Sequence, residues 1–295
     1  MLILISDAFD SSLAGRLSTF GEVTDDKSRM ADAQVILIRS KTTCDKEYID
    51  KAKNLKLIIR GGVGIDNIDK EYAMSKGIVV RNTPKASSIA VAELAFAHMI
   101  SVPNRIVEGH TSMVDGKWIK KELKRTELFE KTLCLVGLGN ISKEVAKRAA
   151  AFGMKVVAYD KYIENSDLAD MKGTLNEAVA DADYISMHLP LTPETEGIMN
   201  KDIINSFTKK PVIINTGRGA CINPEDMKLA LEDGRIRAYA TDVYPTDPPD
   251  DDCPLRNVKN VFMTPHIGAS SVENLLRIGS EAHSIIDELV KGGKI

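Results

Sequence analysis

Short runs of apolar, often β-branched residues alternate along the chain with longer amphipathic stretches. Continuous apolar runs of this length are typical of strands in a parallel sheet, where helices cover both faces. The pattern therefore predicts an α/β fold. The expected strands are Leu2–Ile5, Gln34–Ile38, Leu57–Ile59, Ile78–Val80, Leu133–Val136, Val156–Tyr159, Tyr184–Met187, Val212–Asn215, Ala238–Thr241 and Val261–Met263.

Two longer stretches have the period of a helix. Apolar residues recur from Ile89 to Ile100 at roughly helical spacing, so we expect one long helix over Ser87–Glu108. The polar stretch Glu108–Lys131 follows and separates two series of strands, which makes the long helix the expected hinge between two domains. A second helix, Val272–Val290, closes the sequence, and its periodicity does not say on which domain it packs.

Length and composition narrow the class of protein. A chain of 295 residues suggests two domains, and 43% hydrophobic with 27% charged residues excludes a disordered, collagen-like or coiled-coil chain. Lysine and arginine number 39 against 42 acidic residues, a net charge of −3. This balance gives no electrostatic reason to expect a nucleic acid or a membrane as partner.

The cysteine spacing and the apolar run at the N-terminus indicate the cellular compartment of the protein. The apolar run at the N-terminus stops at Asp7, too early for a signal peptide. The closest cysteines in sequence, Cys221 and Cys253, are 32 positions apart, so no metal-knuckle or redox spacing occurs. We therefore expect a cytoplasmic protein with reduced thiols and no metal site.

A glycine-rich turn follows the fifth expected strand. Its pattern is Gly137-x-Gly139-x-x-Ser142, and a helix begins just after it. The first glycine permits a tight turn, and the second lets the backbone approach a pyrophosphate at the helix N-terminus. Asp160 ends the next strand, 21 positions after Gly139, where a carboxylate bonds a ribose 2′-hydroxyl and repels a 2′-phosphate. The pattern predicts a bound dinucleotide; the alternative is a βαβ turn without a ligand.

Three polar residues follow later strands and form a candidate catalytic set. Arg218 follows one expected strand, and His266 follows another directly after Pro265. Asp247 lies between them in a rigid acidic turn, from which a carboxylate can hold an imidazole and favour its protonated form. Arginine orients a carbonyl and histidine supplies a proton, which suits hydride transfer to a 2-keto acid. The alternatives are a surface arginine and a structural histidine.

Eight motifs in order resemble those of the D-isomer-specific 2-hydroxyacid dehydrogenases, above all the short 3-phosphoglycerate dehydrogenases that lack a regulatory domain. The motifs span most of the chain: residues 60–69 (RGGVGIDNID), 82–84 (NTP), 90–94 (AVAEL), 137–142 (GLGNIS), 187–192 (MHLPLT), 215–219 (NTGRG) and 241–244 (TDVY), followed by 264–268 (TPHIG).

The resemblance implies two doubly wound parallel-sheet domains: a Rossmann domain that binds NAD (99–270), inserted into a flavodoxin-like substrate domain (1–98 and 271–295). It implies three catalytic residues: Arg218, Asp247 and His266. It implies NAD contacts from Gly137, Gly139, Asn140, Ile141, Asp160, His188, Pro190, Thr216, Asp242 and Gly268. It further implies substrate contacts from Arg60, the backbone amides of Val63 and Gly64, and Lys85.

Two positions depart from the family pattern. The histidine's partner is usually a glutamate, whereas Asp247 is one methylene shorter, so a shift of the backbone or a longer bond is expected. Ser142 replaces the third glycine of the dinucleotide fingerprint, a mild change because serine is nearly as small. Asp242 is the alternative partner for the imidazole of His266.

The substrate remains a choice among hypotheses. Lys85 and Arg60 together favour a phosphorylated 2-hydroxy acid, although both can equally be solvated surface cations. Oxidation of D-3-phosphoglycerate, the first step of serine synthesis, is the leading hypothesis. Reduction of glyoxylate or hydroxypyruvate, and a non-catalytic NAD-sensing partner protein, are the alternatives. The resemblance also implies a homodimer formed through residues 108–131, and no serine-binding regulatory domain is expected after Ile295.

Overall fold

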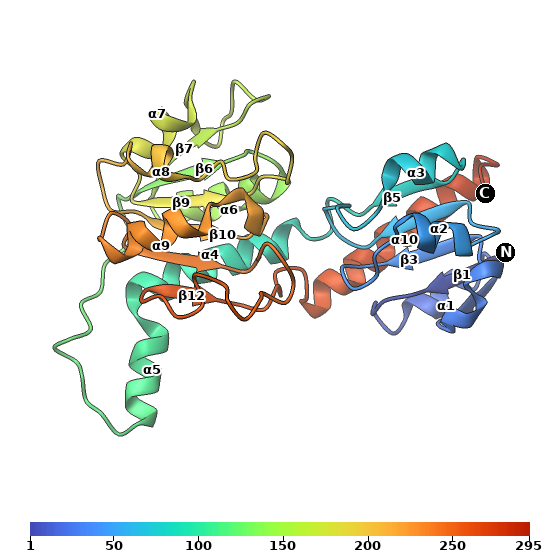
Figure 1. The fold of residues 1–295 in the computed structure, drawn as a ribbon, viewed down its shortest axis with the longest axis horizontal. Helices are drawn as coiled ribbons and strands as arrows, with labels where there is room; N and C mark the ends of the chain where they lie inside the picture. The colour runs from blue at the N-terminus through green and yellow to red at the C-terminus, as the bar shows by residue number, and fades with distance from the viewer. The chain divides into compact units, whose positions relative to one another are not determined.

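The computed structural model describes residues 1–295, which fold into two compact units. The first unit contains Met1–Ala90 and Ala269–Ile295, and the second contains Val91–Gly268 (Figure 1). Helix α4 (Ser88–Asn104) contains the boundary between them, so the expected domain boundary after residue 98 lies inside this helix.

The first unit is built on a five-stranded parallel sheet. Its strand order is β2-β1-β3-β4-β5. Four of these strands were predicted; the edge strand β2 was not, because it has three residues and no continuous apolar run. The strands are β1 (Leu2–Ile5), β2 (Glu22–Thr24), β3 (Val35–Ile38), β4 (Leu57–Arg60) and β5 (Val79–Asn82).

Helices cover both faces of this sheet. The C-terminal helix α10 (Val272–Lys291) packs on one face, where Ala282 and Ile286 are buried against Ile3 and Leu37. The question that periodicity left open is thus answered: α10 belongs to the first unit. The other helical elements of this unit are α1 (Leu13–Leu17), η1 (Lys27–Asp32), α2 (Lys46–Lys51) and α3 (Lys70–Ser75).

The second unit is built on a seven-stranded parallel sheet of order β12-β11-β10-β9-β6-β7-β8. Chain order reverses between β6 and β9, and ligands of open α/β sheets bind at the carboxyl ends of strands beside such a switch point. The strands are β6 (Thr132–Val136), β7 (Lys155–Tyr159), β8 (Asp170–Met171), β9 (Tyr184–Met187), β10 (Val212–Asn215), β11 (Ala238–Thr241) and β12 (Val261–Met263).

Two apolar cores, one on each face, enclose this second sheet. The edge strand β8 was not predicted, because two residues carry no readable period. The helical elements are α6 (Asn140–Ala151), α7 (Leu175–Ala180), α8 (Lys201–Ile204), η2 (Gly219–Cys221) and α9 (Pro224–Glu232). The predicted α/β fold with parallel sheets is confirmed.

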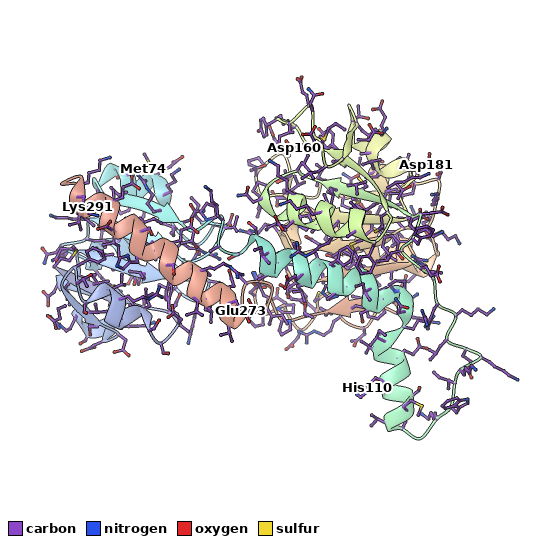
Figure 2. The ribbon with its side chains drawn as sticks, turned by 180° about the vertical axis from the view of Figure 1, so that it is seen from behind. Met74, His110, Asp160, Asp181, Glu273 and Lys291 are labelled. Atoms are coloured by element: carbon purple, nitrogen blue, oxygen red, sulfur yellow. The ribbon has the colours of Figure 1, made fainter.

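One prediction about the helices is wrong. The stretch 87–108 is not a single helix, because Arg105 adopts a left-handed conformation (φ 55°) that ends α4 and begins α5 (Ile106–Val114). Part of the expected polar stretch 108–131 is therefore helical. Helix α5 and the chain after it extend away from the sheet of the second unit, with His110 on the helix (Figures 1 and 2). No helix of the protein is both long and apolar enough to cross a membrane.

Candidate active site

The glycine-rich turn joins β6 to α6 at the switch point. Gly137 has φ 85°, and a Cβ there would come within 2.9 Å of the Leu189 side chain, so only glycine fits. Gly139 is the N-cap of α6 and offers no side-chain cap, which leaves the first N–H groups of the helix for an anion. Ser142 is buried, and its hydroxyl donates to the Gly137 carbonyl at 2.6 Å. The serine thus fits the fingerprint and stabilises the turn.

Asp160 follows the carboxyl end of β7 (Figure 2). Its Oδ2 accepts a hydrogen bond from the Leu138 amide at 2.7 Å, inside the glycine-rich turn. Its Oδ1 accepts from the amides of Tyr162 (2.8 Å) and Ile163 (3.1 Å). These bonds fix the carboxylate beside the turn, and they leave lone pairs on Oδ2 for a further donor such as a hydroxyl.

His188 and Thr216 meet on the other side of the switch point, after β9 and β10. The His188 ring lies 2.9 Å from the Ser186 hydroxyl through Nε2 and 3.3 Å from the Thr216 hydroxyl through Nδ1. Burial lowers the pKa of His188 to about 3, so its imidazole is neutral at physiological pH. Pro190 is exposed, and its carbonyl accepts from the Thr195 hydroxyl at 2.6 Å.

The buried state of His188 predicts acid sensitivity. Its folded pKa of about 3 lies below the ordinary value of 6.5, so below pH 6.5 the unfolded chain binds a proton that the folded chain does not. The free energy of unfolding should therefore fall by a few kcal/mol, to order of magnitude, as pH drops from 6.5 towards 3. When the free energy of unfolding is measured with urea over this pH range, it should fall less steeply for His188→Asn than for the native protein. Parallel curves for the variant and the native protein would contradict this account.

Arg218 follows β10 and precedes η2. The buried Asn215 shapes this turn: its side chain accepts from the Gly217 amide and donates to the Arg218 carbonyl, both at 3.0 Å. The guanidinium donates to the Gly217 carbonyl at 2.7 Å. A Cβ on Gly219 would lie 2.1 Å from the backbone of Tyr244, so glycine is required where the turn meets the loop after β11. These contacts hold Arg218 at the carboxyl edge of the sheet.

Asp242 holds the turn that carries the candidate histidine. Its buried carboxylate accepts from the Thr264 hydroxyl (2.7 Å) and from the amides of Ile267 and Gly268 (both 2.8 Å). His98 of α4, which the sequence analysis did not select, lies 3.3 Å from the same Thr264 hydroxyl. Burial lowers the pKa of His98, against a smaller opposite effect of Asp242. The signal available in the sequence was a histidine within the apolar run Ala95–Ile100.

The structure brings Asp247 and His266 together. Nδ1 of His266 forms a hydrogen bond and ion pair with the Asp247 carboxylate, although the two residues are 19 positions apart. The backbone of His266 is left-handed (φ 51°). Because Nδ1 is held by the carboxylate, the other ring nitrogen is the one available for proton exchange.

The expected substrate residues of the first unit lie on two loops that are bonded to each other. Arg60 ends β4, and a Cβ on Gly62 (φ 146°) would lie 1.6 Å from its guanidinium, so the arginine folds over a glycine. The Thr83 amide donates to the Gly62 carbonyl at 3.1 Å, and the Asn82 side chain donates to the Val63 carbonyl at 2.5 Å. The loop with Val63 and Gly64 is therefore tied to the segment before Lys85.

Helix α10 supplies three residues that the sequence analysis missed. Glu281 accepts from the Ala86 amide at 3.1 Å, and Arg277 donates to the Ala86 carbonyl at 3.0 Å. Asn274 donates to the Ser87 hydroxyl at 3.2 Å. Burial raises the pKa of Glu281. These three polar residues hold the backbone beside Lys85. The signal in the sequence that could have identified them is their spacing of three and four positions on an otherwise apolar helix face.

Comparison with known proteins places this geometry in context. Residues 96–268 match the family described as D-isomer specific 2-hydroxyacid dehydrogenase, NAD binding domain. The chain is 39% identical to a D-3-phosphoglycerate dehydrogenase of Methanocaldococcus jannaschii over 98% of its own length and 57% of the relative's. It is 43% identical to a hydroxypyruvate reductase of Thermotoga maritima over 85% of the chain and 82% of the relative. The chain thus spans about half the length of the matching phosphoglycerate dehydrogenases.

Solved structures agree with the fold. A D-lactate dehydrogenase of Aquifex aeolicus, in complex with NAD and lactic acid, has a TM-score of 0.87 at 26% identity, over 100% of this chain and 97% of that one. The TT0316 protein of Thermus thermophilus has a TM-score of 0.88 at 31% identity, over 99% and 97%. The predicted fold and the predicted NAD-binding domain are confirmed by these similarities.

Proposed function

Because the chain belongs to the D-isomer-specific 2-hydroxyacid dehydrogenases, we propose that it oxidises D-3-phosphoglycerate to 3-phosphohydroxypyruvate with NAD as hydride acceptor. The observation that carries this proposal is the Asp247–His266 pair in the unit that also contains the glycine-rich turn and Arg218. A proton acceptor, a carboxylate-binding cation and a dinucleotide turn are the parts that oxidation of a 2-hydroxy acid requires.

The glycine-rich turn fits NAD. The uncapped N–H groups at the start of α6 suit a pyrophosphate, and the missing Cβ of Gly137 leaves room for it. Asp160 would accept from the ribose hydroxyl, and His188 and Thr216 would line the opposite wall. When bound, NAD supplies the acceptor for the hydride that leaves C2 of the substrate.

His266 would take the hydroxyl proton of the substrate. Asp247 orients the imidazole through Nδ1 and stabilises the imidazolium that forms when the ring accepts this proton. Arg218 would hold the substrate carboxylate and polarise the C2 oxygen, which a planar guanidinium does with two parallel hydrogen bonds. Asp242 acts on the reaction through the turn that it fixes rather than through the imidazole.

In the first unit, we assign the anionic groups of the substrate to the amides of Val63 and Gly64 and to the cations Arg60 and Lys85. Several relatives named D-3-phosphoglycerate dehydrogenase support the phosphorylated substrate. The relative named hydroxypyruvate reductase, of which this chain covers 82%, supports hydroxypyruvate reduction as the second candidate. Steady-state rates with NAD or NADH and a panel of 2-hydroxy and 2-keto acids test the choice: kcat/KM highest for 3-phosphoglycerate supports the proposal, and higher values for hydroxypyruvate or glyoxylate overturn it.

Asp160 should decide the choice of cofactor. Its carboxylate repels the 2′-phosphate of NADP and accepts from the NAD ribose, so the native protein should prefer NAD. Asp160→Asn keeps a side-chain oxygen as acceptor for the Leu138 amide but removes the charge. The kcat/KM with NAD divided by the kcat/KM with NADP should therefore be smaller in this variant than in the native protein. Equal efficiency of the native protein with both cofactors would exclude this role.

We further propose that two copies associate through α5 and the chain that follows it. Large apolar side chains are exposed there: Ile106, Val107, Met113, Val114 (72% exposed) and Trp118 (77% exposed). Exposed apolar residues gathered on one extended segment mark an interface in a soluble protein. A second copy would bury them in a two-fold contact.

Trp118, the only tryptophan, reports this association directly. Its emission should be blue-shifted at high protein concentration and move to longer wavelength on dilution, because the indole returns to water. Val114→Asp should give a monomer in sedimentation velocity, whereas the neighbouring Asp115→Asn should not. A native protein that sediments as a monomer at all concentrations would rule the dimer out.

A further inference from the structure

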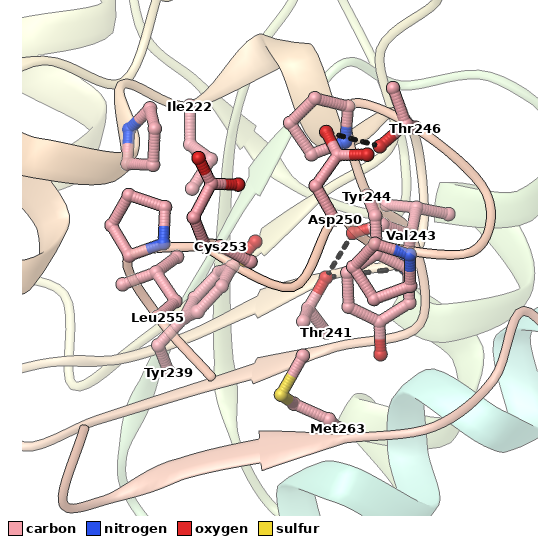
Figure 3. Close-up of a pocket in the computed structure, with 16 residues that line it drawn as sticks. Ile222, Tyr239, Thr241, Val243, Tyr244, Thr246, Asp250, Cys253, Leu255 and Met263 are labelled. Carbon is pink, nitrogen blue, oxygen red and sulfur yellow. Dashed lines mark hydrogen bonds between the residues drawn. The ribbon is translucent and has the colours of Figure 1, made fainter. Parts of the chain in front are cut away.

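A largely apolar cavity of about 110 Å³, partly open to solvent, lies behind the loop that carries Asp247 (Figure 3). Its floor is formed by Tyr239 and Thr241 of β11 and Met263 of β12, and residues 243–255 form its roof. Ile222 and Leu255 lie together on one side of it (Figure 3). Asp247 itself does not line it.

The walls of the cavity are buried and neutral. Tyr239 is 1% exposed, and Val243 and Leu255 are buried with it. Burial raises the pKa of Tyr239 and of Tyr244 to about 12, so both phenols are uncharged at physiological pH. Protein interiors are close-packed, and an apolar cavity of about 150 Å³ is known to stay dry and to bind benzene. The present cavity is smaller but partly open to solvent, so it has room for one small aromatic ring whose polar substituent extends outwards.

The rim of the cavity is anionic. Asp250 and Asp252 line it, and the Asp250 carboxylate accepts from the Thr246 hydroxyl at 3.1 Å (Figure 3). Asp251 lies between them and pairs with Arg256 at 3.0 Å. Two carboxylates thus line the same cavity as the apolar side chains, which favours a ring that bears a positive charge.

The roof connects the cavity to the catalytic pair. Tyr244 anchors its start, because the phenol donates to the Thr264 carbonyl at 2.7 Å, and buried Leu255 anchors its end. Residues 245–248 between these anchors are exposed. The conformation with the cavity formed is also the one in which Asp247 reaches His266. A molecule that binds the cavity only in this conformation would stabilise the paired state of the loop.

We propose that this cavity is a binding site for a small aromatic ammonium ion, which raises turnover by holding Asp247 on His266. The ring occupies the space between Tyr239, Leu255 and Met263, and the ammonium group lies between Asp250 and Asp252. The binding step is independent of the proposed dehydrogenase function, whereas the effect on turnover rests on it.

Binding is tested with benzylammonium as probe, followed by the NMR signal of the ¹³C-labelled Met263 methyl group. Benzylammonium should shift this signal saturably with a Kd near or below about 1 mM, the range open to eight non-hydrogen atoms. Benzyl alcohol should bind more weakly and benzoate not at all. No saturable shift, or equal binding of benzoate and benzylammonium, overturns the proposal.

Variants locate the site. Asp252→Asn should weaken binding of benzylammonium about two- to fivefold, the effect of one exposed charge. Cys253→Phe places a ring in the cavity and should abolish binding, while Cys253→Ser leaves the space open and should retain it. Undiminished binding to a folded Cys253→Phe protein overturns the location. If that variant does not fold, the location of the site is decided by the shift of the Met263 signal and by the weaker binding to Asp252→Asn.

The effect on turnover is measured at saturating probe. The kcat should rise about two- to tenfold, as expected when a partly populated competent state becomes dominant, with KM values unchanged. In Asp247→Asn the Met263 shift should persist while the rise in kcat disappears. Binding without a change in the native kcat overturns the coupling. A chain that binds benzylammonium but turns over no 2-hydroxy acid overturns the proposed function and leaves the site standing.

Discussion

Replacing His266 by alanine should lower kcat by about 10² to 10⁴ in both directions of the reaction, the range measured for loss of a general acid–base group. The side chain lies at the carboxyl edge of the second sheet with one ring nitrogen held by Asp247, which leaves the other ring nitrogen to exchange the proton. Binding of NADH, followed by its fluorescence, should be nearly unchanged. A variant that retains most of its kcat would show that the proton is carried by another group.

Two neighbouring variants separate the roles of the carboxylates. Asp247→Asn keeps the shape of the side chain but removes the charge that stabilises the imidazolium, so kcat should fall by at least about tenfold with stability unchanged. Asp242→Asn disturbs three hydrogen bonds to Thr264, Ile267 and Gly268, and should lower both kcat and the free energy of unfolding. Equal effects of the two variants on stability would contradict this division.

Replacing Lys85 by alanine should raise KM for 3-phosphoglycerate by about 10- to 150-fold, which corresponds to a charge-assisted contact of roughly 1.5–3 kcal/mol. The KM for small unphosphorylated keto acids such as glyoxylate should change little, because they lack the phosphate group to which the ammonium is assigned. Lys53→Ala, an exposed lysine of the same unit, is the matched control and should leave both KM values unchanged.

A variant in α10 tests the role of Lys85 indirectly, through the backbone next to it. Glu281 and Arg277 hold Ala86 from α10, so Glu281→Ala should raise KM for 3-phosphoglycerate less than Lys85→Ala does, and Glu281→Gln should recover most of the loss. If Lys85→Ala raises KM for glyoxylate as much as for 3-phosphoglycerate, the lysine does not bind a phosphate group.

Sequence patterns alone were sufficient to predict the longer parallel strands and the glycine-rich turn. All ten expected strands form, because continuous apolar runs with turn residues between them require no knowledge of distant neighbours. The glycine-rich turn could be predicted for the same reason, since the positive φ of Gly137 and the start of α6 after Gly139 are features of the local backbone. Strands β2 and β8 were missed because edge strands of two or three residues have no period to read.

Tertiary structure decided the matters that depend on pairing across long stretches of chain. The apolar stripe of α10 fits any sheet face, and only the packed first unit shows its partner. The break at Arg105 is a backbone choice that the apolar period of 87–108 did not reveal. The sequence favoured Asp247 as the partner of His266 and left Asp242 as the alternative, because both lie near His266 in the chain. The path of the loop after β11 places Asp247 on the imidazole, while burial commits Asp242 to the amides of the turn.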